Sequence, residues 1–271
     1  MLDTEDVMQL SLDLAGLKEI PEDTAIHVSG DNISNVLFGI DAGVPELLFA
    51  KEHGYDCVIT HHPQGTAIIN FHKVFRRHIS QMIEAGVPKK AAEKTVMKKL
   101  RELEIQNHTR NYAHAVNFAK LLGMPYMNIH TPLDEVGRRR MIKKIQRGFV
   151  SKTTVQDLVN SLNELTEFQN AATEIKIRLG SPENLAGKVV VSHGAGTNGG
   201  YEIAKTYFEH GISTVIYIHI HPSDLEKLKA DERGNLIVTG HIVSDSIGIN
   251  PFINELGKRN VVVDRIDVIP G

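Results

Sequence analysis

The stretch NVLFGIDAGVPELLFAKEHGYDCVITHHP, residues 35–63, decides the type of fold. Asn35 to Ile40 has the apolar character of a buried strand, and Pro45 to His53 has the pattern of a helix. Asp56 to Thr60 is a second apolar run, which ends directly before His61. A strand, a helix and a second strand in this order form a βαβ unit, whose strands run parallel. The stretch therefore predicts an α/β protein.

The same alternation recurs nearer the carboxyl end of the chain. Lys188 to Ser192 and Thr214 to Ile220 read as strands, and Tyr201 to His210 reads as the helix between them. These three segments predict a second βαβ unit. Further single strands are expected at Met124 to Ile129, Leu236 to Thr239 and Val261 to Val268.

Helical patterns fill most of the remaining chain. Asp3 and Thr4 are suitable caps for a helix that runs to about Gly16. Residues 74–122 predict two or three helices, with breaks at Gly86 to Pro88 and Asn107 to Thr109. The basic run Arg138 to Arg147 precedes another helical pattern, and we interpret this region as the crossing into a second domain. We predict two α/β domains, each a layered sheet with helices on both faces.

Composition excludes several classes of protein. Hydrophobic residues at 41% and charged residues at 23% are ordinary for a globular chain. The formal charge of −3 provides no general attraction for nucleic acid or anionic membranes. Asp3 and Glu5 stand where a secretory signal carries positive charge, and no apolar run is long enough to span a bilayer, so we expect a cytoplasmic protein. The single cysteine, Cys57, is expected to be a buried strand residue rather than a catalytic thiol.

Metal-ligating residue types follow three of the predicted strands. His61 and His62 come after CVIT, His130 to Asp134 after YMNI, and His241 to Asp245 after LIVTG. In open parallel sheets, ligands gather outside the carboxyl ends of the strands, so segments far apart in sequence meet there. This recurrence predicts a divalent-metal site.

Each residue of the predicted site has a chemical reason. Pro63 restrains His62 to an extended conformation, so the imidazoles of His61 and His62 can diverge towards two ions. His241 and Asp245 are four residues apart, which places them on one face of a helix. Asp134 supplies a carboxylate, which can bridge two cations. A structural or merely exposed His pair, and an accidental HxxxD spacing, are the alternatives for the separate motifs.

Three other features have competing interpretations. Gly194, Gly196 and Gly199 match the GxGxxG of dinucleotide-binding turns, but the acidic residue expected after the next strand is missing, which favours a simple glycine turn. His193, His219 and His221 could form a secondary metal or proton-transfer group, with ordinary strand-end histidines as the alternative. The basic run could hold phosphates or RNA, but a solvated helix face near a domain junction is favoured.

Four motifs resemble one known family. NVLFGIDAG (35–43), VITHHP (58–63), NIHTPLDE (128–135) and TGHIVSD (239–245) look like segments of the Nif-three-like dinuclear-metal hexameric proteins, often described as GTP cyclohydrolase I type-two homologues. The last ligand in that family is usually Glu, whereas Asp245 is one methylene shorter. The resemblance implies the following metal ligands: His61, His62, Asp134, His241 and Asp245.

The resemblance also implies an architecture and an assembly. A discontinuous metal-binding domain of residues 1–145 and 235–271 would enclose an inserted domain of residues 146–234, and six copies would form a ring. Two divalent ions, chosen among Zn, Fe, Mn, Co and Ni, would be the cofactors.

Two ions can activate water and polarise the group under attack, so metal-assisted hydrolysis of a nucleotide is the leading expectation. By the resemblance, GTP would be opened at its purine imidazole ring, and His221 would move protons. The alternatives are a metal-dependent assembly or regulatory protein without turnover, and a phosphoesterase acting on nucleotides.

Overall fold

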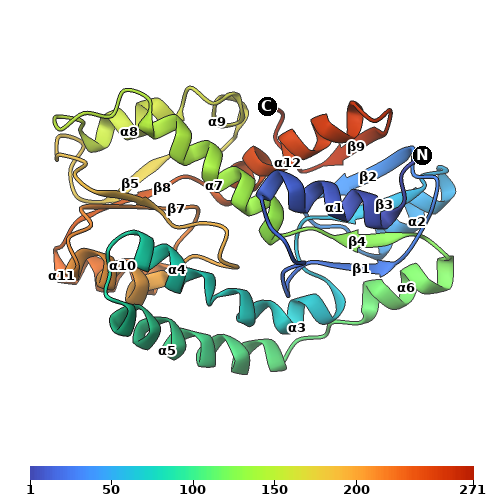
Figure 1. The fold of residues 1–271 in the computed structure, drawn as a ribbon, viewed down its shortest axis with the longest axis horizontal. Coiled ribbons are helices and arrows are strands. Elements are labelled where there is room, and N and C mark those ends of the chain that lie inside the picture. Colours follow the sequence, from blue (N-terminus) through green and yellow to red (C-terminus); the bar gives the residue numbers. More distant parts are fainter. The chain divides into compact units, whose positions relative to one another are not determined.

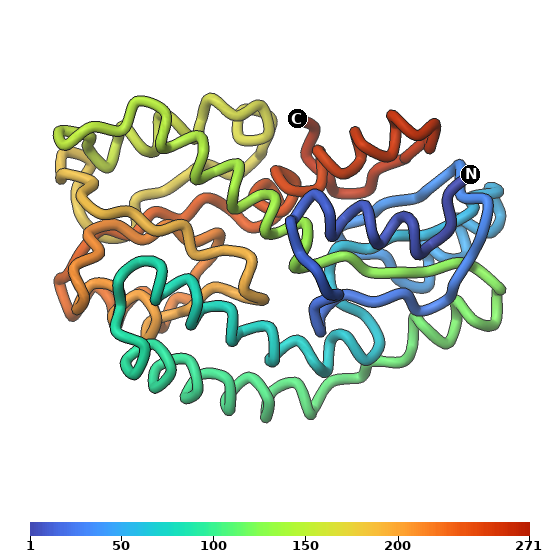
Figure 2. Tube along the Cα trace, viewed as in Figure 1, coloured from blue at the N-terminus to red at the C-terminus, as the bar shows by residue number.

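The computed structural model describes residues 1–271 and divides the chain into two compact units (Figures 1 and 2). The first unit consists of Met1–Val74, Leu103–Val136 and Gly248–Val268. The second consists of Phe75–Glu102, Gly137–Ile247 and Ile269–Gly271. Residues 75–102, 137–145, 235–247 and 269–271, which the sequence places in the predicted metal-binding domain, group here with the second unit. The predicted domain division itself stays a prediction. Each unit contains its own sheet with helices packed on it, which confirms the predicted α/β class.

The first unit contains a five-stranded sheet of order β1-β4-β3-β2-β9. β2 pairs in parallel with both β3 and β9, β3 pairs in parallel with β4, and β1 is antiparallel to β4. Val36 lies opposite Cys57 and Gly39 opposite Thr60, so the predicted βαβ unit is present with its strands in parallel. The strand bounds are Ala25–Val28 (β1), Asn35–Gly39 (β2), Cys57–Thr60 (β3), Tyr126–Asn128 (β4) and Val262–Ile266 (β9).

Helices cover both faces of this sheet. Val58 on one face packs with Leu47 of α2 and Ala119 of α6 in a single apolar cluster. On the other face the ring of Phe38 lies 6.3 Å from that of Phe252 in α12, measured between centroids. The helices with residues in this unit are α1 (Thr4–Ala15), α2 (Val44–Glu52), α3 (Gly65–Val74), α6 (His114–Leu122) and parts of α5 (Lys89–His108), α7 (Thr131–Gln146) and α12 (His241–Gly257).

The second unit contains a four-stranded sheet of order β5-β8-β7-β6. β6, β7 and β8 run parallel, whereas β5 is antiparallel to β8. The strand predicted through Ile220 ends at Tyr217, and His221 and Pro222 begin a helix that the sequence patterns did not indicate. The strand bounds are Lys176–Leu179 (β5), Val189–Val191 (β6), Thr214–Tyr217 (β7) and Asn235–Val238 (β8).

The helices of the second unit lie on both sides of its sheet (Figure 1). Met141 of α7 and Leu158 of α8 pack with Ile216 and Ile237 of the sheet in one apolar cluster. The basic run lies in α7 except for its last residue, Arg147, which follows the helix. The helices wholly within this unit are α4 (Arg77–Glu84), α8 (Val155–Leu162), α9 (Thr166–Asn170), α10 (Gly200–Glu209) and α11 (Pro222–Asp231), and parts of α5 and α12 also belong to it.

No helix of the structure is both long enough and apolar enough to cross a membrane. Cys57 is fully buried in β3, as predicted, and burial raises the pKa of its thiol far above the ordinary value. A thiol in this state does not ionise near neutral pH and is a packing residue.

Candidate metal centre

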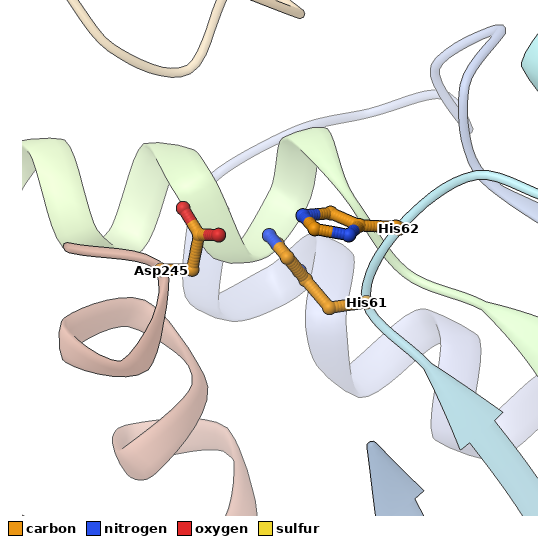
Figure 3. A group of neighbouring side chains, drawn as sticks. All are labelled: His61, His62 and Asp245. Atoms are coloured by element: carbon orange, nitrogen blue, oxygen red, sulfur yellow. The ribbon is translucent and has the colours of Figure 1, made fainter. Parts of the chain in front are cut away.

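The first candidate ligands stand where the chain leaves β3 (Figure 3). The backbone N–H of His61 donates to the carbonyl of Gly39 at 2.8 Å, and that of His62 donates to the carbonyl of Ile40 at 3.0 Å. Pairing with β2 therefore continues beyond the last residue of the strand. Because neighbouring residues of extended chain point in opposite directions, His61 is buried whereas His62 keeps partial exposure.

The ring of His61 is held by the backbone of the neighbouring strand segment. Its Nδ1 donates to the carbonyl oxygen of Ile129 at 3.0 Å, so its Nε2 is the atom available as a ligand. This Nε2 lies 3.1 Å from Oδ1 of Asp134. A lone-pair nitrogen and a carboxylate oxygen at this separation are favourable only with a proton or a cation between them. The arrangement therefore fits a bound metal ion.

His130 follows β4 and precedes the first turn of α7. Its Nδ1 donates to Oδ2 of Asp23 at 2.7 Å, and its Nε2 lies 3.7 Å from Oδ2 of Asp134. All three side chains are buried. Burial by itself lowers the pKa of His130, but the carboxylates of Asp134 and Asp23 outweigh it and raise the pKa to about 9. The local field therefore favours a positive charge at this point, whether a proton or a metal ion carries it.

His61, His130 and Asp134 form one group of possible ligands. One ligand atom of each lies within 4.8 Å of the ligand atoms of the other two, and all three residues are buried. Two imidazoles and one carboxylate suit Zn, Fe, Mn, Co or Ni. The first unit thus contains a buried His and Asp cluster able to hold a divalent ion.

His62 has a carboxylate partner of its own. Its Nδ1 donates to Oδ1 of Asp41, the residue that follows Ile40 after β2, at 2.9 Å. Ligating histidines commonly donate their second nitrogen to a carboxylate, which fixes the ring and its tautomer. The centroids of the His61 and His62 rings are 5.4 Å apart, so the two imidazoles are neighbours without stacking.

The second unit carries the other predicted pair. Gly240, with a φ of 108°, turns the chain from β8 into α12, where His241 begins the helix and Asp245 lies one turn later. Nε2 of His241 is 3.4 Å from Oδ2 of Asp245, which confirms the prediction that both lie on one helix face. The ring of His219 packs against that of His241, with centroids 4.8 Å apart.

His219 and His221 were expected to lie on one strand, but both follow the end of β7 at Tyr217. Asn198 donates its side-chain amide to Nδ1 of His219 at 2.6 Å. His221 is exposed and caps α11, because its Nδ1 accepts from the backbone N–H of Ser223 at 3.3 Å. β7 ends at Tyr217, and His221 stands outside it as the extended residue that precedes Pro222 at the start of α11. The role of His221 as a proton carrier stays a prediction.

The glycine turn after β6 is held from behind by α4. Nε of Arg77 donates to Gly194 O at 2.7 Å, Nε2 of His78 to Thr197 O at 2.9 Å, and Nε2 of Gln81 to the carbonyl of residue 193 at 2.7 Å. Burial lowers the pKa of His78 to about 4, the Thr197 carbonyl opposes this shift, and nearby arginines add to it. His78 is therefore a neutral imidazole that fixes the turn.

The basic run in α7 is engaged mainly within the second unit. Nε of Arg138 donates to the carbonyl of Val191 at 3.2 Å, Arg140 pairs with Glu167 at 2.6 Å, and Lys144 pairs with Glu164. These pairings occupy the basic side chains within the unit and argue against a phosphate or RNA site. They also hold Arg138 and Lys144 against the protein, so the run is not simply the solvated helix face that was expected.

The five predicted ligands are divided between the two units. His61, His62 and Asp134 belong to the first, whereas His241 and Asp245 belong to the second. Their union in one dinuclear cluster stays a prediction. His130 was not among the predicted ligands, although His130 and Asp134 have the same HxxxD spacing as His241 and Asp245, and that repetition could have indicated it. Asp23 had no such signal, because it lies 107 residues from His130.

Comparisons with known proteins agree with this fold. A NIF3 superfamily protein from Sphaerobacter thermophilus is 44% identical to the chain, with a TM-score of 0.96 and 98% of each chain covered. HcgD in its reduced form, from Methanocaldococcus jannaschii, has a TM-score of 0.61 at 12% identity over 98% of this chain and 99% of its own. A protein from Thermus thermophilus has a TM-score of 0.54 at 14% identity, with both chains fully covered.

The last two likenesses concern the fold alone. No protein-family model and no curated protein matches the chain. The Sphaerobacter relative extends over nearly the full length at substantial identity, and this confirms the resemblance seen in the four sequence motifs. The chain belongs to the NIF3 superfamily.

Proposed function

We propose that this chain is a divalent-metal-dependent hydrolase that acts on a nucleotide, with GTP as the first candidate. The metal ions would be held by His61, His62 and Asp134 of the first unit together with His241 and Asp245 of the second. The single observation that carries the proposal is the buried contact between Nε2 of His61 and Oδ1 of Asp134 at 3.1 Å. A cation bound here would satisfy both residues, and a carboxylate can bridge two ions.

The side chains around the site prepare it for binding. The Ile129 carbonyl fixes the tautomer of His61, and Asp41 does the same for His62, so both Nε2 atoms are presented as ligands. Divalent ions held in this way lower the pKa of water and polarise a carbonyl, imine or phosphoryl group. A site that ends at the carboxyl edge of a parallel sheet leaves room for a substrate beside its ligands.

The substrate class rests on the family resemblance and on the chemistry of the ligand set. Mixed imidazole and carboxylate ligation is typical of hydrolytic sites, whereas four thiolates, or thiolates with histidines, form closed structural sites. Hydrolytic opening of the GTP purine ring is the reaction to test first. Release of phosphate from nucleotides is the second.

The experiment uses metal-free protein reconstituted separately with Zn²⁺, Mn²⁺, Fe²⁺, Co²⁺ and Ni²⁺. Each sample is incubated with GTP and then with other nucleotides, and products are separated by chromatography and tested for free phosphate. We expect turnover with at least one metal, none without metal, and none in a His61→Gln variant. His72→Gln is the matched control, because His72 donates within α3 to the Ile69 carbonyl and lies in the same unit.

A metal-replete sample that turns over no nucleotide would refute the hydrolase. If the same sample bound a protein partner only when metal was present, a regulatory function would replace it. We also propose that the protein assembles as a homo-oligomeric ring of six, as the family resemblance implies. Native mass spectrometry with and without metal tests this assembly directly.

A further inference from the structure

We propose that His130 is an additional metal ligand of the site in the first unit, and that Asp23 is the residue that orients it. This inference rests on the proposed metal-dependent function. It extends the set of ligands beyond the five residues that the sequence motifs indicated. The ion that these residues would bind is a divalent cation of a first-row transition metal.

The two nitrogens of His130 have different surroundings. Nδ1 donates to Oδ2 of Asp23 at 2.7 Å, which leaves Nε2 facing the Asp134 carboxylate at 3.7 Å. A histidine that gives one ring N–H to a carboxylate and directs the other nitrogen to a carboxylate-bearing site has the arrangement found around protein-bound metals. The Asp23 contact also makes the imidazole a stronger electron-pair donor.

Asp23 is itself fixed by its neighbours. Its Oδ2 accepts a second hydrogen bond from Oγ1 of Thr131 at 2.7 Å, and its backbone carbonyl accepts from Nδ2 of Asn128 at 2.6 Å. The backbone N–H of His130 donates to Oγ1 of Thr24 at 3.1 Å. Because all of these groups are buried, the ring of His130 has little freedom to turn away from Asp134.

The spacing of the donor atoms is suitable for a shared ion. Ligand atoms bound at about 2.0 to 2.2 Å from one tetrahedral ion lie roughly 3 to 4 Å from one another. The contact of His61 with Asp134 is 3.1 Å and that of His130 with Asp134 is 3.7 Å, so both fall in this range. One ligand atom from each of the three residues lies within 4.8 Å of the others, so small side-chain adjustments bring all three onto one ion.

Another histidine of the same unit provides a contrast. Nε2 of His27 contacts Oδ1 of Asn128 at 2.9 Å, so its partner is a neutral amide rather than a carboxylate. His27 is half-buried in β1 and belongs to none of the possible ligand groups. It is therefore a matched control for His130, since both side chains contact the same buried network.

The test is a titration of the metal-free full-length protein with Co²⁺, followed by calorimetry and by visible absorption. We expect His130→Gln to raise the Kd for Co²⁺ by roughly 100-fold or more and to change the absorption bands, because one nitrogen ligand is lost. Asp23→Asn keeps the shape of the side chain but weakens the orienting contact, so the Kd should rise about 10- to 100-fold with the bands largely retained. His27→Gln should leave both the Kd and the bands as in the wild type.

The outcomes separate this inference from the proposed function. If His61→Gln abolishes Co²⁺ binding while His130→Gln and Asp23→Asn keep the wild-type Kd and bands, His130 is not a ligand and only the inference fails. If the wild-type protein binds no Co²⁺, both fail. Circular dichroism establishes whether each variant is folded, and the near-isosteric Asp23→Asn decides the matter should His130→Gln not fold.

Discussion

Replacing Arg140 by methionine should destabilise the second unit more than any ordinary surface substitution. Arg140 lies in α7, and its Nη1 contacts two acceptors at once: Oε1 of Glu167 at 2.6 Å and the backbone carbonyl of Ile247 at 2.5 Å. The carbonyl of Ile247 needs this donor because Pro251 lies four residues later inside α12 and has no N–H to offer. Methionine keeps the aliphatic stem and removes both contacts.

The expected magnitude follows from these two contacts. Removal of one partner from a buried ion pair costs about 3 to 5 kcal/mol. The side chain of Glu167 is 1% exposed, but that of Arg140 is 33% exposed, so solvent screening reduces this part to about 2 to 3 kcal/mol. An unsatisfied backbone carbonyl adds about 1 kcal/mol. Arg140→Met should therefore lower the free energy of unfolding by about 3 to 4 kcal/mol.

Urea denaturation monitored by circular dichroism and tyrosine fluorescence measures this loss, since the chain contains no tryptophan. Pro251→Ala supplies the missing N–H, so in the Arg140→Met background it should recover about 1 kcal/mol relative to its effect in the wild type. A loss below about 1 kcal/mol for Arg140→Met would refute the ion-pair reasoning. An identical effect of Pro251→Ala in both backgrounds would refute the role given to the Ile247 carbonyl.

Three further outcomes are expected. Asp134→Ala should remove most of the bound metal, as measured by elemental analysis. The circular dichroism spectrum should stay unchanged, because the residue lies at the first turn of α7. Unchanged metal stoichiometry would contradict the assignment of Asp134 as a ligand. The pKa of His78 falls from 6.5 to about 4 on folding, because burial disfavours the charged imidazole. Protonation of this residue therefore leaves the free energy of unfolding unchanged above pH 6.5 and lowers it by about 3 kcal/mol as the pH falls to 4. Urea denaturation across this range should show a smaller loss of unfolding free energy in His78→Gln than in the wild type. Gly240→Ala should lower the free energy of unfolding by about 2 to 3 kcal/mol, because φ is 108° and the new Cβ would lie 2.8 Å from Oγ1 of Thr173. Gly54→Ala, which has a positive φ but open space around its Cβ, should lower it by only about 1 kcal/mol in the same assay.

Local patterns were enough to predict the central strands and the helices beside them. The run from Asn35 to Thr60 is apolar where β2 and β3 are buried, and its helix is marked by Pro45 at the start. The spacing of His241 and Asp245 indicated a shared helix face, because residues four apart are neighbours on any α-helix. These features depend only on residues close together in sequence.

Short and half-exposed strands were not predictable in this way. β1 has intermediate burial at all four positions and β5 alternates exposed and half-buried residues, so neither carries a strong apolar signal. Both are antiparallel edge strands, and their place is determined by pairing with β4 and β8, which come from distant parts of the chain. Pairing over such distances has no local sequence signature.

The site shows the same division. Sequence alone predicted His61, His62 and Asp134 as ligands, because residue types and strand ends are visible in the order of amino acids. Only the tertiary structure brought Asp23 to His130, across 107 residues, and showed which ring nitrogen faces Asp134. A histidine becomes a defined donor through the group that holds its other nitrogen, and that group is selected by how the chain folds rather than by its neighbours in sequence.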